Sequence, residues 1–150
     1  FGGEWFAEAY VEGREFNIAL LGNAHRLTVL PMAEMTFADW PEGQPRIVGY
    51  GAKWDEDSSG WKHTVRKFGV EKDEPVLAAR LKEICERVWR GFALSGFVRV
   101  DFRVRDGEPL VLEINVNPCI SPDAGFAAAA AEARMDYDAL IDEIVKAALP

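Results

Sequence analysis

The chain has 150 residues, 49% hydrophobic and 28% charged, so it can bury a core and is expected to fold as a single domain over residues 1–150. Its 25 acidic and 17 basic residues give a net charge of −8, which argues against a nucleic-acid partner. No run approaches the roughly 18 apolar residues of a membrane span. Two cysteines without metal-ligand spacing or disulfide-scaffold density favour a cytoplasmic location.

The first residue is Phe1 rather than methionine. We therefore expect a fragment of a longer protein, with part of any site supplied by the sequence that precedes it. The fragment alone should fold but be inactive as an enzyme, because it has no Gly-rich stretch that could cradle phosphates with successive backbone N–H groups.

Alternating apolar and polar residues predict three strands in the first quarter of the chain. The first is expected over residues 4–12 and the third over residues 26–37, where Pro31 implies an edge position or a bulge. The second strand, between them, has an apolar face made of Phe16, Ile18 and Leu20.

Residues 39–72 are rich in Gly, Pro and Asp and lack a sustained period. They predict a long loop, with one short strand near residues 46–50, that acts as a lid over a site. Three tryptophans in this stretch indicate that the loop packs onto something: Trp40, Trp54 and Trp61.

The second half of the chain predicts a helix, a β-hairpin and two further helices. Pro75 suits a first helical position, and apolar residues follow it at helical spacing. After Pro118 come an alanine-rich helix and a last helix with Asp136 as candidate N-cap. The order of elements predicts an α+β fold, an antiparallel β-sheet with helices packed on one face.

The hairpin, FVRVDFRVRDGEPLVLEINVNP, has an apolar and a polar face. A two-residue turn would pair residues of opposite faces, so we expect a three-residue loop, Arg105-Asp106-Gly107, which sets Arg99 opposite Glu113 and Asp101 diagonal to it. Oxygen ligands for magnesium or manganese then gather on one face: Asp101, Glu113 and Asn115. Arg99 beside them suits a phosphate oxygen. The alternative is an amphipathic hairpin whose solvated face mixes charges.

Four segments in this order, AEAYVEGREFNIALLG, AKW, VRVDF and LEINVNP, resemble the carboxy-terminal half of an ATP-grasp domain, most of all that of the D-alanine–D-alanine ligase family. The resemblance implies that ATP lies between two subdomains with two Mg²⁺ or Mn²⁺ ions. It also implies that the γ-phosphoryl group passes to a carboxylate and that an amine attacks the acylphosphate. The expected partners are ATP, small amino-acid substrates, the missing N-terminal half of the same domain and, in a homodimer, a second copy.

Position by position, the resemblance assigns roles to ten residues. It matches Asp101, Glu113 and Asn115 to the metal ligands, Arg99 to the arginine that steadies the transferring phosphoryl group, and Lys53 to a phosphate-contacting lysine of the closing loop. It matches the adenine and ribose contacts to Glu8, Ala9, Val11, Glu15 and Leu112. Phosphoryl transfer needs positioning and charge neutralisation, which suits this set.

Two positions depart from the family pattern. Cys119 stands where a glycine is usual, and Ala124 stands where a serine that helps hold a substrate carboxylate is expected, with Ser121 nearby as a substitute. Two alternatives to a D-alanine–D-alanine ligase-like activity follow. One is an ATP-grasp ligase of other amino-acid specificity, and the other is a non-catalytic nucleotide- or partner-binding module.

Overall fold

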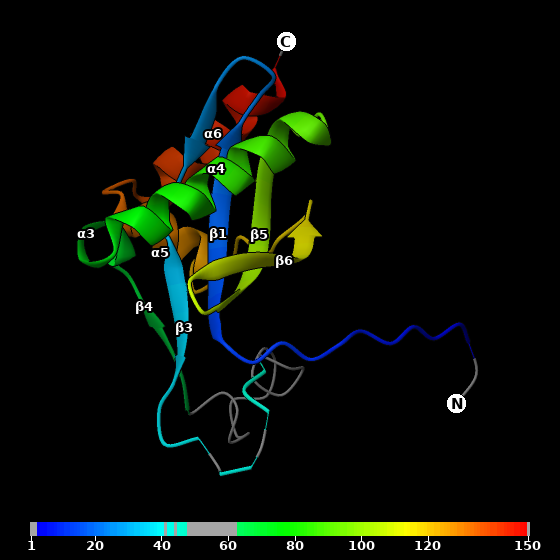
Figure 1. Ribbon diagram of the computed structural model, residues 1–150. Coiled ribbons are helices and arrows are strands. Elements are labelled where there is room, and N and C mark those ends of the chain that lie inside the picture. The colour runs from blue at the N-terminus through cyan, green and yellow to red at the C-terminus, as the bar shows by residue number, and fades with distance from the viewer. Residues whose placement is uncertain (1–2, 41, 44, 48–62, 150) are drawn as a thin grey trace.

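The computed structural model describes residues 3–40, 42–43, 45–47 and 63–149 of the protein, shown in Figure 1. In chain order the elements are β1 (Arg14–Gly22), β2 (Leu27–Val29), β3 (Ala33–Phe37), β4 (Thr64–Lys67), α3 (Val70–Asp73), α4 (Pro75–Gly91), β5 (Gly96–Arg105), β6 (Glu108–Asn115), α5 (Gly125–Glu132) and α6 (Tyr137–Ala148). None of the helices among these residues is both long and apolar enough to cross a membrane.

The strands form one antiparallel sheet in the order β4-β3-β1-β5-β6, and β2 pairs with β1 outside this path. The central pair is β1 with β5, matched from Arg14 opposite Val104 to Gly22 opposite Gly96. This pairing joins segments about 80 residues apart in sequence, so it fixes the hairpin of β5 and β6 to the first strand. The α+β class with an antiparallel sheet, predicted from the sequence, is confirmed.

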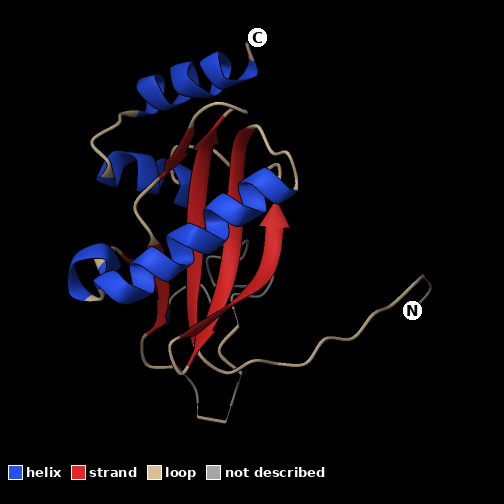
Figure 2. Ribbon diagram, turned by 45° about the horizontal axis from the view of Figure 1, so that its top comes forward, coloured by secondary structure: helices blue, strands red, loops and turns tan. Residues whose placement is uncertain are grey.

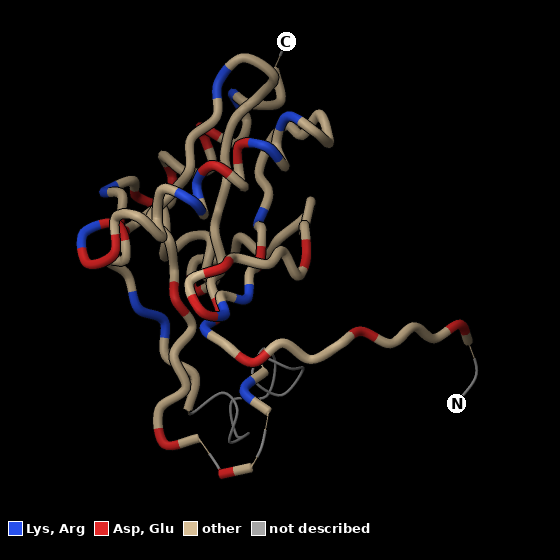
Figure 3. Tube along the Cα trace, in the orientation of Figure 1, with Lys and Arg blue, Asp and Glu red and all other residues tan. Residues whose placement is uncertain are grey.

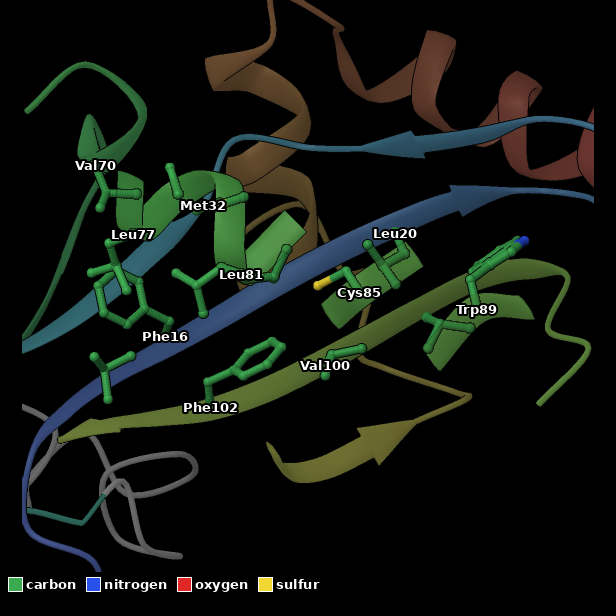
Figure 4. Packing of buried hydrophobic residues seen from close by; sticks show 14 residues of the cluster. Phe16, Leu20, Met32, Val70, Leu77, Leu81, Cys85, Trp89, Val100 and Phe102 are labelled. Carbon is green, nitrogen blue, oxygen red and sulfur yellow. The ribbon is translucent and has the colours of Figure 1, made fainter. Parts of the chain in front are cut away.

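One face of the sheet packs against α4, which crosses it diagonally (Figure 2). Figure 4 shows the contact: Phe16, Val100 and Phe102 of the sheet meet Leu81 and Cys85 of the helix. All five side chains are fully buried. The apolar stripe read at helical spacing in α4 therefore has the role predicted for it, covering the apolar face of the hairpin.

The opposite face is covered at one end by α5 and α6. Their side chains form a second core with odd-numbered residues of the strands, among them Ala19 and Leu21, and Phe126 stacks edge-to-face on Phe97 with ring centroids 6.0 Å apart. The expectation that helices cover one face only is therefore wrong. Strand positions on this face are small or apolar near α5 and α6, so that end is also shielded from water.

The first expected strand does not form. Residues 4–12 have no strand partner among the described residues and run away from the sheet in an extended course (Figure 1). Their alternation resembled that of a strand, yet Trp5 and Phe6 are 74% and 86% exposed, so no apolar face is buried there.

The third expected strand is split in two around Pro31. β2 pairs with one end of β1 and β3 with the other. Between them one backbone hydrogen bond to β1 is described, from the N–H of Leu30 to the carbonyl of Ala19 at 2.9 Å. Proline has no N–H to donate, so the ladder is interrupted there, as the sequence predicted.

The predicted loop of residues 39–72 contains more structure than expected. β4 lies within it and the short helix α3 begins in it, and β4 adds an edge strand beside β3. The four residues of β4 alternate too briefly to give a periodic signal. Residues 41, 44 and 48–62 of the predicted lid lie outside the described residues, and the described residues 46 and 47 of the expected short strand are not in a strand.

Candidate functional site

The turn between β5 and β6 differs from the expected three-residue loop. Arg105 pairs with Glu108, so the turn has two residues, Asp106 and Gly107, with φ values of 53° and 78°. Two successive positive φ values are typical of the type I′ turn, whose twist matches that of the strands of a hairpin. Asp-Gly is a preferred sequence for this turn. The expected register, with Arg99 opposite Glu113, is therefore wrong.

A β-bulge between Asp101 and Phe102 restores the parity that the short turn would break. Phe102 pairs with Val111 and Asp101 pairs with Glu113, so Leu112 is the extra residue on β6. Beyond the bulge the polar residues of both strands share one face, because the period of a strand is two.

The corrected register brings the candidate metal ligands closer than predicted. Asp101 lies directly opposite Glu113 rather than diagonal to it, and Arg99 lies opposite Asn115. Directly opposite residues have backbones about 4.5–5.5 Å apart, less than the 7–8 Å of a diagonal pair. The two carboxylates and the amide therefore project from one patch of the sheet.

Arg99 and Asp101 form a two-point ion pair within β5. Nε of Arg99 donates to Oδ1 of Asp101 at 2.7 Å, and Nη2 donates to Oδ2 at 2.8 Å. Asp101 is 5% exposed. Burial alone would lower the pKa of Arg99, but the hydrogen bonds and charge of Asp101 outweigh it and raise that pKa. Arg99 therefore stays a cation, positioned by the carboxylate beside it.

A second ion pair lies on the same face and joins β1 to β5. Glu15 and Arg103 are opposite each other, with Nη2 of Arg103 3.1 Å from Oε2 of Glu15, and both residues are buried. Arg103 also donates to the carbonyl of Gly13 at 3.0 Å and to that of Arg46. Arg103 was not identified from the sequence. The sequence did contain a signal for it, because Arg103 alternates with apolar residues and so lies on the same face of β5 as Asp101.

The expected adenine hinge lies beside this ion pair and is mostly exposed. Glu8 and Ala9 are exposed, and Val11 is partly buried. Between them, Tyr10 has its ring 6.0 Å from the guanidinium carbon of Arg103, and its hydroxyl accepts a hydrogen bond from the backbone N–H of Arg46 at 3.2 Å. Tyr10 thus connects the extended segment to the polar face.

The chemistry of Asp101, Glu113 and Asn115 fits a magnesium ion. Hard oxygen donors with a few waters and phosphate oxygens complete the octahedral shell that Mg²⁺ prefers. Oδ1 of Asn115 accepts from the N–H of Asn117 at 3.0 Å, which orients the amide at the end of β6. Among the described residues no three His, Cys, Asp or Glu side chains form a group that could hold a metal ion.

The remaining residues expected at the site lie apart from this patch or outside the described part of the chain. Leu112, the bulge residue, is 48% exposed on β6. Lys53 lies outside the described residues. Cys119 is exposed, with its Sγ 3.1 Å from Oγ of Ser121, and the carbonyl of Ser121 accepts from the N–H of Ala124 at 2.8 Å.

Arg66, which sequence reasoning also missed, extends the polar face to the far edge of the sheet. It lies opposite Met35, which lies opposite Glu15, so Arg66 shares the face of Glu15 and Arg103. Figure 3 shows basic residues on β4 at this edge, while acidic and basic residues alternate on β5. Residues of one face from β4 to β6 thus form a single polar surface, hereafter the polar face: Arg66, Glu15, Arg103, Asp101, Arg99, Glu113 and Asn115.

Comparison with known proteins decides the family. The family model described as D-ala D-ala ligase C-terminus matches residues 3–146. The chain belongs to this family. An uncharacterized protein of Sinorhizobium fredii is 34% identical over 94% of the chain, and a D-alanine–D-alanine ligase of Flavobacterium psychrophilum is 29% identical over 97%.

The fold agrees with this family. A D-alanine–D-alanine ligase of Bacillus anthracis, solved in complex with ATP, matches 92% of the chain and 37% of its own chain with a TM-score of 0.67 and 20% identity. The chain spans 40% of the length of each of the two curated relatives. The region matched is thus the carboxy-terminal part of a ligase fold.

Proposed function

We propose that the chain is the carboxy-terminal part of an ATP-dependent carboxylate–amine ligase of the D-alanine–D-alanine ligase type, with the rest of the nucleotide cleft supplied by a preceding part of the same protein. The observation that carries the proposal is the pairing of Asp101 with Glu113, beside Arg99 and Asn115, in a chain of this family. Use of ATP is supported by the related ligase solved with that nucleotide.

The reaction proceeds in two displacements. A carboxylate oxygen of the first amino acid attacks the γ-phosphorus of ATP, the bond from that phosphorus to the β-γ bridging oxygen breaks, and ADP leaves. The amine of the second amino acid then attacks the acyl carbon, the carbon–oxygen bond to phosphate breaks, and phosphate leaves as the nitrogen loses a proton. Both steps place negative charge on phosphoryl oxygens, so cationic groups near them lower the barriers.

In this proposal the phosphate end of the site lies on β5 and β6. Asp101, Glu113 and Asn115 would hold two Mg²⁺ or Mn²⁺ ions, which would supply positive charge to the phosphates. Arg99 donates hydrogen bonds to the transferring phosphoryl group, and its ion pair with Asp101 keeps the guanidinium on the polar face. Lys53, from outside the described residues, adds a second cation.

The nucleoside end lies toward the start of β1. Backbone groups of Glu8, Ala9 and Val11 are extended and offer N–H and C=O groups to the edge of adenine. Glu15 binds the ribose hydroxyls, and the exposed Leu112 packs on the base. We expect this ATP-consuming protein in the cytoplasm.

The test uses protein made from the complete reading frame. ADP and phosphate release are measured with ATP, Mg²⁺ and D-alanine, followed by a panel of other amino acids. Release that depends on an amino acid, together with a new amide product by mass spectrometry, supports the proposal. Glu113→Gln should abolish release, whereas Glu108→Gln, on the same strand but paired with Arg80 at the surface, should retain it. Nucleotide binding without release under any condition would instead indicate a non-catalytic module.

A further inference from the structure

Arg66 is a cation on the polar face for which the proposed chemistry has no role so far. It is partly buried, and no hydrogen bond or ion pair joins it to another residue in the described part of the chain. Burial lowers the pKa of Arg66, and the positive charge of Arg99 lowers it further. A guanidinium in such surroundings loses water without gaining an acidic partner, so an anionic ligand would stabilise it.

The neighbours of Arg66 show where such a ligand would sit. A methyl group in place of a Gly125 hydrogen would lie 3.3 Å from Nη2 and 3.6 Å from Nε of Arg66, so the guanidinium lies against the first residue of α5. Ala124, the N-cap, supplies no side-chain hydrogen bond to the helix. The first backbone N–H groups of a helix lack intrahelical acceptors and favour an anion.

Acidic residues nearby do not neutralise Arg66. Asp123, two residues before Gly125, is exposed, and a hydrogen bond with Ser121 lowers its pKa. Glu15 lies two strands away and is paired with Arg103. Arg99 is already held by Asp101. Arg66 is therefore the cation of the polar face left for an external anion.

The position of Arg66 indicates which anion. The phosphate end lies on β5 and β6, and β4 is three strands from β5 in the sheet. At about 4.8 Å per strand this is roughly 14 Å across the sheet, and Arg66 is level with Arg103, which lies four residues, or about 13 Å, along β5 from Arg99. The two backbones are therefore about 19 Å apart, a distance that two long arginine side chains largely span, and the charge of Arg99 acts on Arg66. The residues on this face of the sheet between them include Ala33 opposite Asn17 and Met35 opposite Glu15. A small amino acid can lie there with its amine toward Arg99 and its carboxylate toward Arg66.

We propose that Arg66, with the start of α5, binds the carboxylate of the amino acid whose amine is acylated, and so selects acceptors with a free acid group. The inference rests on the proposed ligase function. It assigns substrate recognition to β4, a strand that the sequence did not reveal. Neutral amines and amino-acid amides would lack this contact and should be poor acceptors.

Hydroxylamine separates this role from the activation of the first substrate, because it attacks the acylphosphate but has no carboxylate. The test uses protein from the complete reading frame with ATP, Mg²⁺ and the donor amino acid found in the ADP-release screen. Arg66→Met should leave hydroxamate formation within about twofold of wild type. With an amino acid as acceptor, the KM of Arg66→Met for that amino acid should rise tenfold or more. The preference for the amino acid over the corresponding amino-acid amide should fall by a similar factor. Arg66→Lys should recover part of the loss.

Lys67→Met is the matched control, because Lys67 is the next residue of β4 and points to the opposite face. It should leave both acceptors unaffected. An unchanged acceptor KM in Arg66→Met would overturn the inference. Equal losses with hydroxylamine and with the amino acid would also overturn it, since they would place Arg66 at the phosphate or in the fold. A wild-type protein that forms no hydroxamate with any donor would contradict the proposed ligase function and the inference with it.

Discussion

Arg99 donates to both carboxylate oxygens of Asp101, at 2.7 and 2.8 Å, so the same two oxygens serve an ion pair and a proposed metal site. A metal ion has to displace or share these contacts. The ion pair therefore keeps the Asp101 carboxylate in place, but the positive charge of Arg99 opposes the binding of a metal ion beside it.

Arg99→Met should raise the affinity for Mn²⁺ measured without nucleotide, while it lowers turnover. Removing the guanidinium frees both oxygens and removes a positive charge near the ion, and we expect about a tenfold tighter Kd, equivalent to about 1.4 kcal/mol. Turnover should fall by at least 100-fold, because the charge on the transferring phosphoryl group loses its partner. Isothermal titration and ADP release check the two effects. Arg105→Met, at the exposed end of β5, is the control, and weaker Mn²⁺ binding in Arg99→Met would contradict the shared use of Asp101.

The Glu15–Arg103 pair should be coupled in stability. Arg103→Met leaves the Glu15 carboxylate buried without this partner and should lower the free energy of unfolding by about 3 kcal/mol. The double variant Glu15→Gln/Arg103→Met should lose less than the sum of the single losses, because neither charge of the pair is left buried without the other. Urea unfolding of the four proteins gives the coupling energy. Additive losses would mean that the pair adds nothing beyond its separate packing.

Stability should fall with pH in the alkaline range because of Cys85. This thiol is fully buried, and burial raises its pKa from 9.0 to about 12, with a smaller effect from the charge of Glu86. The unfolded chain then loses the proton at lower pH than the folded chain. The thiol's contribution is complete below pH 9 and is lost as the pH rises toward 12, by up to about 1.4 kcal/mol per pH unit.

Urea midpoints at pH 8.0 and 10.5 test this, with Cys85→Ala as comparison. Cys85→Ala should be less stable than wild type at both pH values, but its urea midpoint should fall less between pH 8.0 and pH 10.5. In the same range Cys119, which is exposed, should react with iodoacetamide in the native protein while Cys85 does not. Two reactive thiols in the native state would contradict the buried position of Cys85.

The last helix should depend on its N-cap. Oδ1 of Asp136 accepts from the backbone N–H of Ala139 at 2.8 Å, as the sequence predicted. Asp136→Ala should lower the free energy of unfolding by about 1 kcal/mol, since this N–H loses its acceptor. Asp138→Ala, in the first turn of the same helix, removes a charge but no cap and should cost only a few tenths. Thermal unfolding of both variants measures the difference.

Local patterns gave much of the fold. Three features depend only on residues near one another in sequence, so they could be predicted: the apolar stripe of α4, the cap at Asp136 and the interruption at Pro31. β4 could not be predicted, because four residues at an edge are held by pairing with β3 rather than by a pattern of their own.

The sequence predicted that the polar residues of the hairpin share one face, but not the register in which they pair. Alternation placed Asp101 and Glu113 on one face, but two arrangements satisfied the parity, a three-residue loop or a two-residue turn with a bulge. The chain adopts the second, because Asp106-Gly107 suits a type I′ turn. The Glu15–Arg103 pair needed the long-range pairing of β1 with β5, for which the two segments alone carry no register signal.

The bulge at Leu112 also determines how relatives of this hairpin can differ in length. Eleven residues separate Asp101 from Glu113, an odd number that a two-residue turn accommodates only with one unpaired residue. A homologue with one residue more between its two carboxylates could keep them opposite each other on a regular ladder, without any bulge. In an alignment, this segment between the two acids should therefore vary in length by one residue at a time. The bulge should be present in homologues with an odd number of intervening residues and absent in those with an even number, and the two acids should stay opposite each other.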